Sequence, residues 1–221
     1  MNLSNKNYPK LLNKYIQVIR EIGFEKIEKT RLEFQFESLM DWSIFMSVEE
    51  LKNWYEDRKK QENMRIEIIP LNECKDWTVN NDKVFHNDGE FFSLEGLRVK
   101  NTNTREVYFG WDQPILKQVG FDGGILGLLR KRFNGIPHYL IEAKAEPGNP
   151  NFVQMSPSLQ ATFSNIKKAH KGSEPNYLDF FINPDKHSAF IHYKCWLAED
   201  GGRFLKKRNL NMLVEIPEDF D

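Results

Sequence analysis

From Ile66 onward the chain alternates short, apolar-rich segments with turn sequences, and this pattern limits the possible folds more than any other feature. Segments of this kind, bounded by Gly, Asn and Asp, are typical of β-strands, and the NDG, NG and DGG sequences are typical turns. We expect eight strands, at 65–71, 91–99, 105–111, 123–132, 138–146, 151–156, 189–196 and 211–217. The turns are expected at 87–89, 134–135 and 200–202.

Many strands with few helices between them predict an α+β fold with a mixed, mostly antiparallel sheet. Aromatic residues make up 13% of the sequence, which fits this prediction because aromatic side chains suit pleated, half-buried surfaces. The polar segment 156–172 is expected to be a loop followed by a short helix capped by Ser164.

The first part of the chain is expected to be helical. Apolar residues at helical spacing predict a helix over 9–22, with Pro9 in its first turn and Gly23 at its end. A second helix is predicted over 48–62, where Ser47 and Glu50 form a capping-box pattern. We interpret its charged second half as a solvated helix face. The predicted organisation is a helical N-terminal part, 1–65, and a single sheet domain, 66–221.

The composition is that of an ordinary soluble globular protein, with 40% hydrophobic and 29% charged residues. Lys and Arg number 31 against 32 Asp and Glu, so no excess of positive charge recruits a nucleic acid. Only two cysteines are present, far apart, and no segment reads as a signal peptide or membrane span. We expect a cytoplasmic protein with neither nucleic-acid nor membrane partners.

Familiar catalytic motifs are missing from the sequence. The segment GFDGGILG lacks the lysine that a phosphate-binding loop needs, and no G-x-S-x-G is found. The five histidines are scattered, and the spacing of His187 and His192 suits a metal pair on neither a helix nor a strand. We therefore expect no metal and no cofactor.

The segment 138–149, HYLIEAKAEPGN, has an unusual alternation. Successive side chains of a strand point to opposite faces, so one face would carry a row of polar and ionisable groups. This row is His138, Leu140, Glu142, Lys144 and Glu146, and two alanines lie on the other face. Such a row fits either an exposed strand with weak ion pairs or a strand that lines a polar cleft.

Six segments, in a fixed order, resemble the NDP-hexose 2,3-dehydratase family, and the resemblance runs from about Trp42 to Glu215. They are WDQP (111–114), GGILGLL (123–129), IEAKAEPGN (141–149), VQMSPSLQATFSN (153–165), YLDFF (177–181) and EDGGRF (199–204). The resemblance implies an α+β fold similar to the Nudix domain, although the Nudix hydrolase signature is not found. Members typically carry two tandem copies of this unit, whereas this chain has one. The difference implies either a homodimer that rebuilds the pair or a stand-alone half with reduced or altered function.

The family resemblance also implies a reaction. The substrate would be a nucleoside diphosphate 4-keto-6-deoxyhexose, commonly a dTDP-sugar, and water would be eliminated across C2 and C3 in deoxysugar biosynthesis. The C4 ketone acidifies the C3 proton, so the enzyme needs a base, a donor for the enolate oxygen and an acid for the C2 hydroxyl. No metal or redox cofactor is required.

We assign candidate roles to residues within the matching motifs and beside them. The catalytic candidates are Glu146, Lys144, Glu142 and Asp112, with His86 and His138 as rival acid–base groups. The substrate-binding candidates are His86, Arg98, Trp111, Gln113, Gln154, Ser156, Gln160, Thr162, Ser164, Asn165 and Arg203. Arginine suits a diphosphate, and uncharged donors suit sugar hydroxyls. Each has a structural alternative: turn chemistry for Asp112, core packing for Trp111, a surface position for the arginines and loop capping for the residues of 154–165.

Three functions remain open at this point. The first is a homodimeric sugar-nucleotide dehydratase, and the second is a non-catalytic sugar-nucleotide-binding subunit or sensor. The third is a related lyase or isomerase acting on another nucleotide sugar. The intact set of ionisable groups at 112, 142, 144 and 146 favours an enzyme, because a binding-only copy is free to lose them.

Overall fold

The computed structural model describes residues 7–103, 107–118, 123–168 and 173–220. Its helices are α1 (Tyr8–Glu21), α2 (Lys29–Glu37), α3 (Val48–Gln61), α4 (Phe163–Ile166) and α5 (Leu178–Ile182), with 3-10 turns η1 (Leu71–Glu73) and η2 (Pro184–His187). Its strands are β1 (Trp77–Val79), β2 (Lys83–His86), β3 (Phe92–Val99), β4 (Trp111–Gln118), β5 (Ile125–Phe133), β6 (Ile136–Ala145), β7 (Val153–Pro157), β8 (Leu159–Ala161), β9 (Phe190–Ala198) and β10 (Arg208–Ile216). The predicted α+β fold is confirmed, and the likeness to the Nudix domain stays a prediction.

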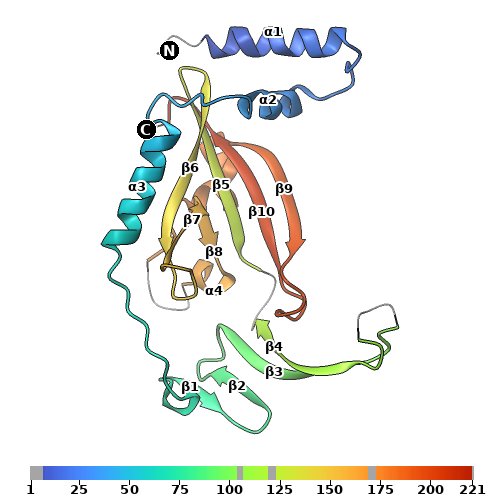
Figure 1. Ribbon diagram of the computed structural model, residues 1–221, viewed down its shortest axis with the longest axis vertical. Helices are drawn as coiled ribbons and strands as arrows, with labels where there is room; N and C mark the ends of the chain where they lie inside the picture. The colour runs from blue at the N-terminus through green and yellow to red at the C-terminus, as the bar shows by residue number, and fades with distance from the viewer. Residues whose placement is uncertain (1–6, 104–106, 119–122, 169–172, 221) are drawn as a thin grey trace.

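The strands form two sheets rather than one (Figure 1). The smaller sheet has the order β1-β2-β3-β4 and is antiparallel throughout. The larger sheet has the order β7-β6-β5-β10-β9, with β8 paired to β5. Its only parallel pair within the described chain is β5 with β10. The division of the chain at residue 65 stays a prediction.

The two longest predicted helices are confirmed. Helix α1 begins at Tyr8 with a proline in its first turn, and Gly23 follows with a φ of 103°. Helix α3 has the complete capping box at Ser47 and Glu50. Helix α2 was not predicted, since its nine residues show little amphipathic periodicity. It buries two apolar residues, Leu32 and Phe36, and one charged residue, Glu33. This combination depends on the residues that the helix contacts rather than on its own periodicity.

Two predicted strands are wrong. The segment 65–70 is not a strand, and the side chain of Ile68 is 98% exposed; the alternating isoleucines find no partner strand between α3 and β1. In the segment 105–111, residues 107–110 are not a strand, and only Trp111 belongs to β4. The WDQP motif is therefore strand rather than turn, and Pro114 is tolerated because β4 is the edge of its sheet.

Helix α4 also corrects the prediction, because its N-cap is Thr162 rather than Ser164. The turns at 87–89, 134–135 and 200–202 are confirmed. At 134–135 both residues have a positive φ, 53° for Asn134 and 74° for Gly135, which is the geometry of a two-residue hairpin. This hairpin joins β5 to β6.

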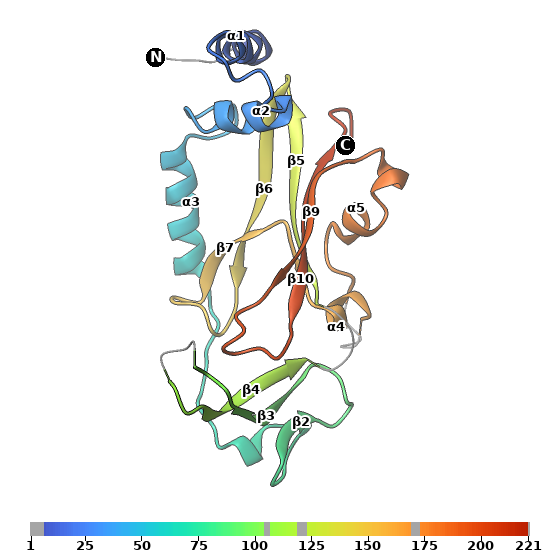
Figure 2. The same cartoon turned by 90° about the vertical axis from the view of Figure 1, so that its right-hand side faces the viewer.

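The main core lies between the larger sheet and α5 (Figure 2). It is built from the buried Ile125 and Leu129 of β5, Met212 and Val214 of β10, and Leu178, Phe180 and Phe181 of α5. Gly127 lets this helix approach, because a Cβ at that position would lie 2.4 Å from the ring of Phe181. A second buried cluster joins α1, α2 and Trp42 to Ile136 at the start of β6.

Strands β5 and β6 diverge below their hairpin, and β7 and β8 fill the fork between them (Figure 1). Ser158 lies at the apex of the fork. Its hydroxyl accepts a hydrogen bond from the backbone N–H of Leu129 at 2.9 Å and donates to the carbonyl of Leu140. The fork therefore brings β8 beside the lower half of β6. No helix in the described part of the chain is long and apolar enough to cross a membrane.

Candidate functional site

The polar row of β6 lines two adjoining cavities. Leu140 pairs with Leu129, a core residue facing α5, so the row lies on the same side of the sheet as α5. Its upper end, at His138 and Leu140, borders a mostly apolar cavity of about 790 Å³. Its lower end, at Leu140, Glu142 and Lys144, borders a polar cleft of about 440 Å³. Of the two interpretations of this alternation, the geometry favours the strand that lines a cleft.

The polar cleft brings together residues from β6 and β8 with Ser158, which lies between β7 and β8. The Lys144 ammonium lies 3.6 Å from a Glu146 carboxylate oxygen and donates to the carbonyl of Gln160 at 3.2 Å. The Gln160 amide donates to Glu146 at 3.5 Å and accepts from the Ser156 hydroxyl at 3.1 Å. Glu142 is exposed and lines the cleft. Gln154 pairs with Lys144 in the β6–β7 register but is exposed.

Helix α3 and the segment before α5 close the other side of the cleft with Trp54, Arg58, Asn176 and Tyr177. We did not predict these four residues from the sequence. Arg58 belongs to the charged half of α3 that we interpreted as a solvated face, and it is exposed, yet it is a cation on the cleft wall. A helical projection of α3 shows Trp54 and Arg58 four residues apart on one face, which is the signal that was available.

Trp54 and Tyr177 line both the polar cleft and the apolar cavity, so they flank the passage between them. Tyr177 has a φ of 64°, in the left-handed region that residues other than Gly and Asn seldom adopt. Strained conformations of this kind cluster at binding sites, where the surrounding structure maintains them.

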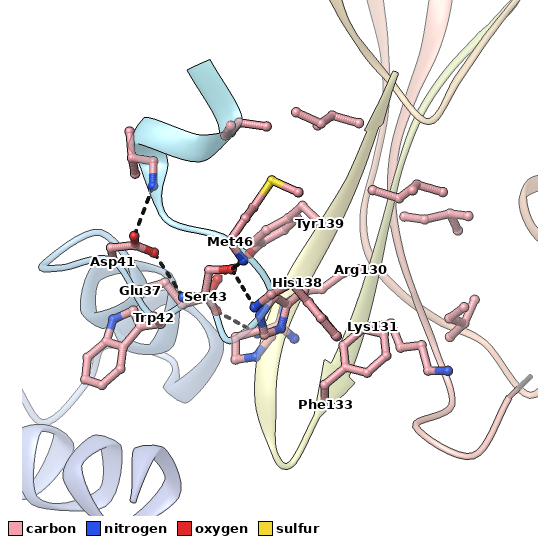
Figure 3. Close-up of a pocket in the computed structure, with 18 of the residues that line it drawn as sticks. Glu37, Asp41, Trp42, Ser43, Met46, Arg130, Lys131, Phe133, His138 and Tyr139 are labelled. Carbon is pink, nitrogen blue, oxygen red and sulfur yellow. Dashed lines mark hydrogen bonds and ion pairs between the residues drawn. The ribbon is translucent and has the colours of Figure 1, made fainter. Parts of the chain in front are cut away.

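The apolar cavity lies between α3, the loop before it and the upper end of β6 (Figure 3). His138 is used structurally here. Its Nε2 accepts the backbone N–H of Ile44 at 3.2 Å, and its Nδ1 lies 2.9 Å from the carbonyl of Ile136. Its ring contacts Phe45 and Phe133 edge-on, with centroids 4.9 Å and 5.4 Å away. Because both ring nitrogens have backbone partners, His138 is poorly placed for proton transfer.

An ion cluster on the other face of the sheet was not anticipated. It consists of Glu33, Glu37, Arg130, Arg132, His192 and Glu215. The Arg130 side chain is 0% exposed, contacts Glu37 at 2.6 Å and forms an ion pair with Glu215. Arg132 contacts Glu33 at 2.8 Å and Glu215 at 2.7 Å. Side chains from α2, β5, β9 and β10, which are far apart in the sequence, thus meet in one cluster.

Burial and charge oppose each other in this cluster. Burial by itself raises the pKa of Glu215, but the hydrogen bond from His192 and the charge of Arg130 outweigh it and lower the pKa to about 2. Burial also raises the pKa of Tyr139, whose hydroxyl donates to Glu37, and the charge of Glu37 raises it further. Glu37, Arg130 and Tyr139 form part of the wall of the apolar cavity (Figure 3). The cluster attaches α2 to the sheet beside this cavity.

The other candidates of the segment 154–165 lie at the start of α4. The Thr162 hydroxyl accepts the backbone N–H of Asn165 at 3.4 Å and lies 2.9 Å from the Ser164 hydroxyl. Thr162 therefore has the capping role that we gave as its structural alternative.

The remaining candidates lie on the smaller sheet and the turn that contacts it. Asp112 and Arg98 form a two-point ion pair at 2.9 and 2.7 Å, and this hydrogen bonding lowers the pKa of Asp112. The Trp111 indole donates to Gln113 at 2.6 Å, and the Gln113 amide donates to the carbonyl of Gly202 at 2.6 Å. Two further candidates, His86 on β2 and Arg203 next to Gly202, each lie near an aspartate.

The structure thus separates the predicted site residues into two groups. Glu142, Lys144 and Gln160 line the polar cleft, with Glu146 and Ser156 bonded to Gln160, whereas Asp112 and its neighbours belong to another sheet. Across the described ranges, no three His, Cys, Asp or Glu side chains gather in a set that could hold a metal ion. The expected independence from metals stays a prediction.

Comparison with known proteins adds an independent finding. A family model described as NDP-hexose 2,3-dehydratase matches residues 48–221. A dTDP-4-dehydro-6-deoxy-alpha-D-glucopyranose 2,3-dehydratase from Streptomyces violaceoruber is 40% identical over 175 residues, which are 76% of this chain and 38% of the relative. Proteins with the same description from Amycolatopsis orientalis and Saccharopolyspora spinosa are 37% and 38% identical, over 80% and 75% of this chain and 38% and 33% of their own. The chain spans less than two fifths of the length of these curated relatives.

Proposed function

The chain belongs to the NDP-hexose 2,3-dehydratase family, and from this premise we propose that it eliminates water across C2 and C3 of a dTDP-4-keto-6-deoxyhexose. The reaction has two parts. A base removes the C3 proton, which the C4 ketone acidifies, and the bonding pair forms an enolate. The enolate then expels the C2 hydroxyl, which leaves as water once protonated, and the resulting enol tautomerises to a 3,4-diketo-2,6-dideoxy sugar.

We place the sugar in the polar cleft. Glu146 or Glu142 is the base for C3, Lys144 donates to the enolate oxygen, and the other carboxyl group assists the C2 hydroxyl. The observation that carries this assignment is the contact of Lys144, on the cleft wall, with Gln160 at 3.2 Å and with the neighbouring Glu146 at 3.6 Å. An ammonium beside a carboxylate suits a reaction in which negative charge moves from a base to an oxygen.

The nucleotide extends from this cleft past Trp54 and Tyr177 toward the apolar cavity. Two aromatic side chains at the passage suit a flat base, because stacking is favourable for every base. Arg58 on the cleft wall is a suitable partner for the diphosphate, since arginine binds phosphate oxygens through several donors. Arg98, Arg203, His86 and Asp112 stay candidates on the smaller sheet, outside this path.

Two wider statements belong to the same proposal. We infer that two copies of this unit work together as a homodimer, because the family resemblance implies paired copies, and that the protein is cytoplasmic. We also infer that it needs neither metal nor nicotinamide. The runner-up function, a binding subunit without catalysis, shares the cleft but not the need for Lys144 and Glu146 as reacting groups.

The test replaces the reacting groups and follows turnover and binding separately. General acid–base groups contribute about 10²–10⁴-fold, so Glu146→Gln and Lys144→Met should each lower kcat by at least about 100-fold. The affinity for dTDP should change far less, because other residues hold the nucleotide. Glu95→Gln and Lys117→Met provide matched controls, since that pair, 3.3 Å apart, lies on the smaller sheet. Substrate recovered from deuterated water before full turnover should carry deuterium at C3, or C3-deuterated substrate should show a primary isotope effect, and the variant that removes the base should show no such exchange.

Two results would contradict this proposal. If Glu146→Gln, Glu142→Gln and Lys144→Met all kept turnover within a few-fold of wild type, the row would be a solvated strand face and the chemistry would move to Asp112 or His86. If the wild-type protein bound dTDP-sugar without turnover, the binding-subunit alternative would replace the enzyme.

A further inference from the structure

The proposed function leaves open which carboxyl group removes the C3 proton, and the surroundings of the two candidates differ. Glu142 is exposed on the wall of the polar cleft, and its carboxylate makes no hydrogen bond or ion pair with any other described residue. Glu146 follows the last residue of β6 and is half-buried, and its carboxylate contacts the side chains of Lys144 and Gln160. Of the two carboxyl groups, Glu146 is therefore the one whose orientation its neighbours restrict.

The backbone of Glu146 is fixed by the turn that joins β6 to β7. Its N–H donates to the carbonyl of Phe152 at 2.9 Å, and its carbonyl accepts the N–H of Asn149 at 3.1 Å. The side-chain amide of Asn149 donates to the carbonyls of Lys144 and Phe152, at 3.4 and 3.2 Å. The asparagine of the IEAKAEPGN motif thus stabilises the turn that carries Glu146.

The orientation of the Gln160 side chain is set from its two ends. The Ser156 hydroxyl, on a residue that is only 7% exposed, donates to the Gln160 amide oxygen at 3.1 Å. A carboxylate accepts hydrogen bonds but cannot donate them, so the amide NH2 group has to face Glu146 and its oxygen has to face the hydroxyl. Ser156, Gln160 and Glu146 therefore form a row with a single direction of donation.

Both side-chain partners of Glu146 contact the same carboxylate oxygen. The Lys144 Nζ lies 3.6 Å and the Gln160 Nε2 lies 3.5 Å from Oε1, whereas Oε2 has no such partner within the described chain. Lys144 is fixed separately, since its ammonium donates to the backbone carbonyl of Gln160 at 3.2 Å. One oxygen of Glu146 thus serves to orient the carboxylate, and the other is available for a proton.

We propose that Glu146 is the base for C3 and that Gln160, oriented by Ser156, is its positioning residue. The C3 proton passes to Oε2, and the pair of the C3–H bond forms the enolate of the C4 ketone. Fixing the base relative to C3 favours this step, because a small misplacement of a reacting group lowers the rate strongly. Glu142 is then the carboxyl group that assists the C2 hydroxyl. This inference rests on the proposed function, and it assigns Gln160 an action through Glu146 rather than on the substrate.

The test is a double-variant cycle that follows kcat and KM separately. Gln160→Met removes the amide but keeps the backbone carbonyl that holds Lys144. We expect kcat to fall about 10- to 100-fold, with KM within about twofold of wild type. In the Glu146→Gln background the same change should have no further effect, because the group that it positions is already lost. Ser156→Ala should lower kcat in the wild-type background and likewise have no effect in Glu146→Gln.

A control and a second readout accompany this cycle. Gln17→Met is the matched control, because it also removes a hydrogen bond from an amide to a carboxylate, the 2.7 Å bond to Glu21 on α1. It should keep the wild-type kcat. The primary isotope effect of C3-deuterated substrate should be larger in Gln160→Met than in wild type, since a misplaced base makes proton removal the slower step.

The outcomes separate this assignment from the proposed function. Wild-type kcat in Gln160→Met, or the same loss in both backgrounds, would overturn the positioning role and leave the dehydratase function intact. A rise in KM with unchanged kcat would show instead that Gln160 binds the substrate. Wild-type turnover in Glu146→Gln together with a large loss in Glu142→Gln would make Glu142 the base. A wild-type protein without turnover would overturn the proposed function and this assignment together.

Discussion

Removal of the Arg130 guanidinium should be among the most destabilising single changes in this protein. Its side chain is 0% exposed and contacts Glu37 at 2.6 Å, Glu33 at 3.4 Å and also Glu215. Burial alone lowers the pKa of Arg130, but the charges of Glu37 and Glu215 raise it well above its usual range, so the group stays protonated. Arg130→Met would leave three carboxylates with Arg132 as the remaining arginine in the cluster.

The magnitude follows from the loss of a buried ion partner. Breaking such a pair by removing one side costs about 3–5 kcal/mol, because the remaining charge is buried without compensation. For a chain of 221 residues this corresponds to a fall in Tm on the order of 10 °C. The assay is urea and thermal unfolding at neutral pH. Arg98→Met is the matched control, since Arg98 also binds a carboxylate through two hydrogen bonds but is 70% exposed. The Tm of this variant should stay at the wild-type value.

Two further results would test the reasoning behind this magnitude. Addition of Glu37→Gln to Arg130→Met should recover part of the lost stability, because it removes one uncompensated charge. Acidification should reduce the difference in stability between wild type and Arg130→Met, since protonation of the buried carboxylates removes the same charges. A loss below about 1 kcal/mol, with no response to pH or to Glu37→Gln, would refute the view that Arg130 compensates buried carboxylates.

Two other predictions concern the same sheet. The pKa of Glu215 is lowered from 4.5 to about 2 on folding, so its contribution of about 3 kcal/mol to stability is present above pH 4.5 and lost as the pH falls toward 2. Glu215→Gln should therefore weaken the dependence of stability on pH between 4.5 and 2. An unchanged pH dependence would contradict the assignment. Gly127→Ala places a Cβ 2.4 Å from the Phe181 ring and should destabilise the protein by about 1–3 kcal/mol in urea titrations. Gly96→Ala, where no atom lies within 4 Å of the new Cβ, should be tolerated; equal effects of the two changes would show that backbone entropy rather than packing decides.

Local patterns in the sequence were sufficient wherever neighbours along the chain determine structure. The capping box at Ser47, the turn at Asn134–Gly135 and the polar row of β6 all depend on residues within one turn of helix or one pleat of strand. These features were therefore predictable without any knowledge of distant contacts. The same local view failed at 65–70, where alternating isoleucines resemble a strand but meet no partner.

The arrangement of the site required contacts between distant segments. Lys144 meets Gln160 because Ser158 holds β7 and β8 in the fork between β5 and β6, and no spacing in the sequence encodes that fork. Asp112 is a catalytic candidate together with Glu142, Lys144 and Glu146, yet strand pairing places it on another sheet. Which β6 side chains share a face could be predicted from the amino-acid order, since alternation is a property of any strand. What that face contacts could not, because pairing between strands depends on the packing of the whole chain.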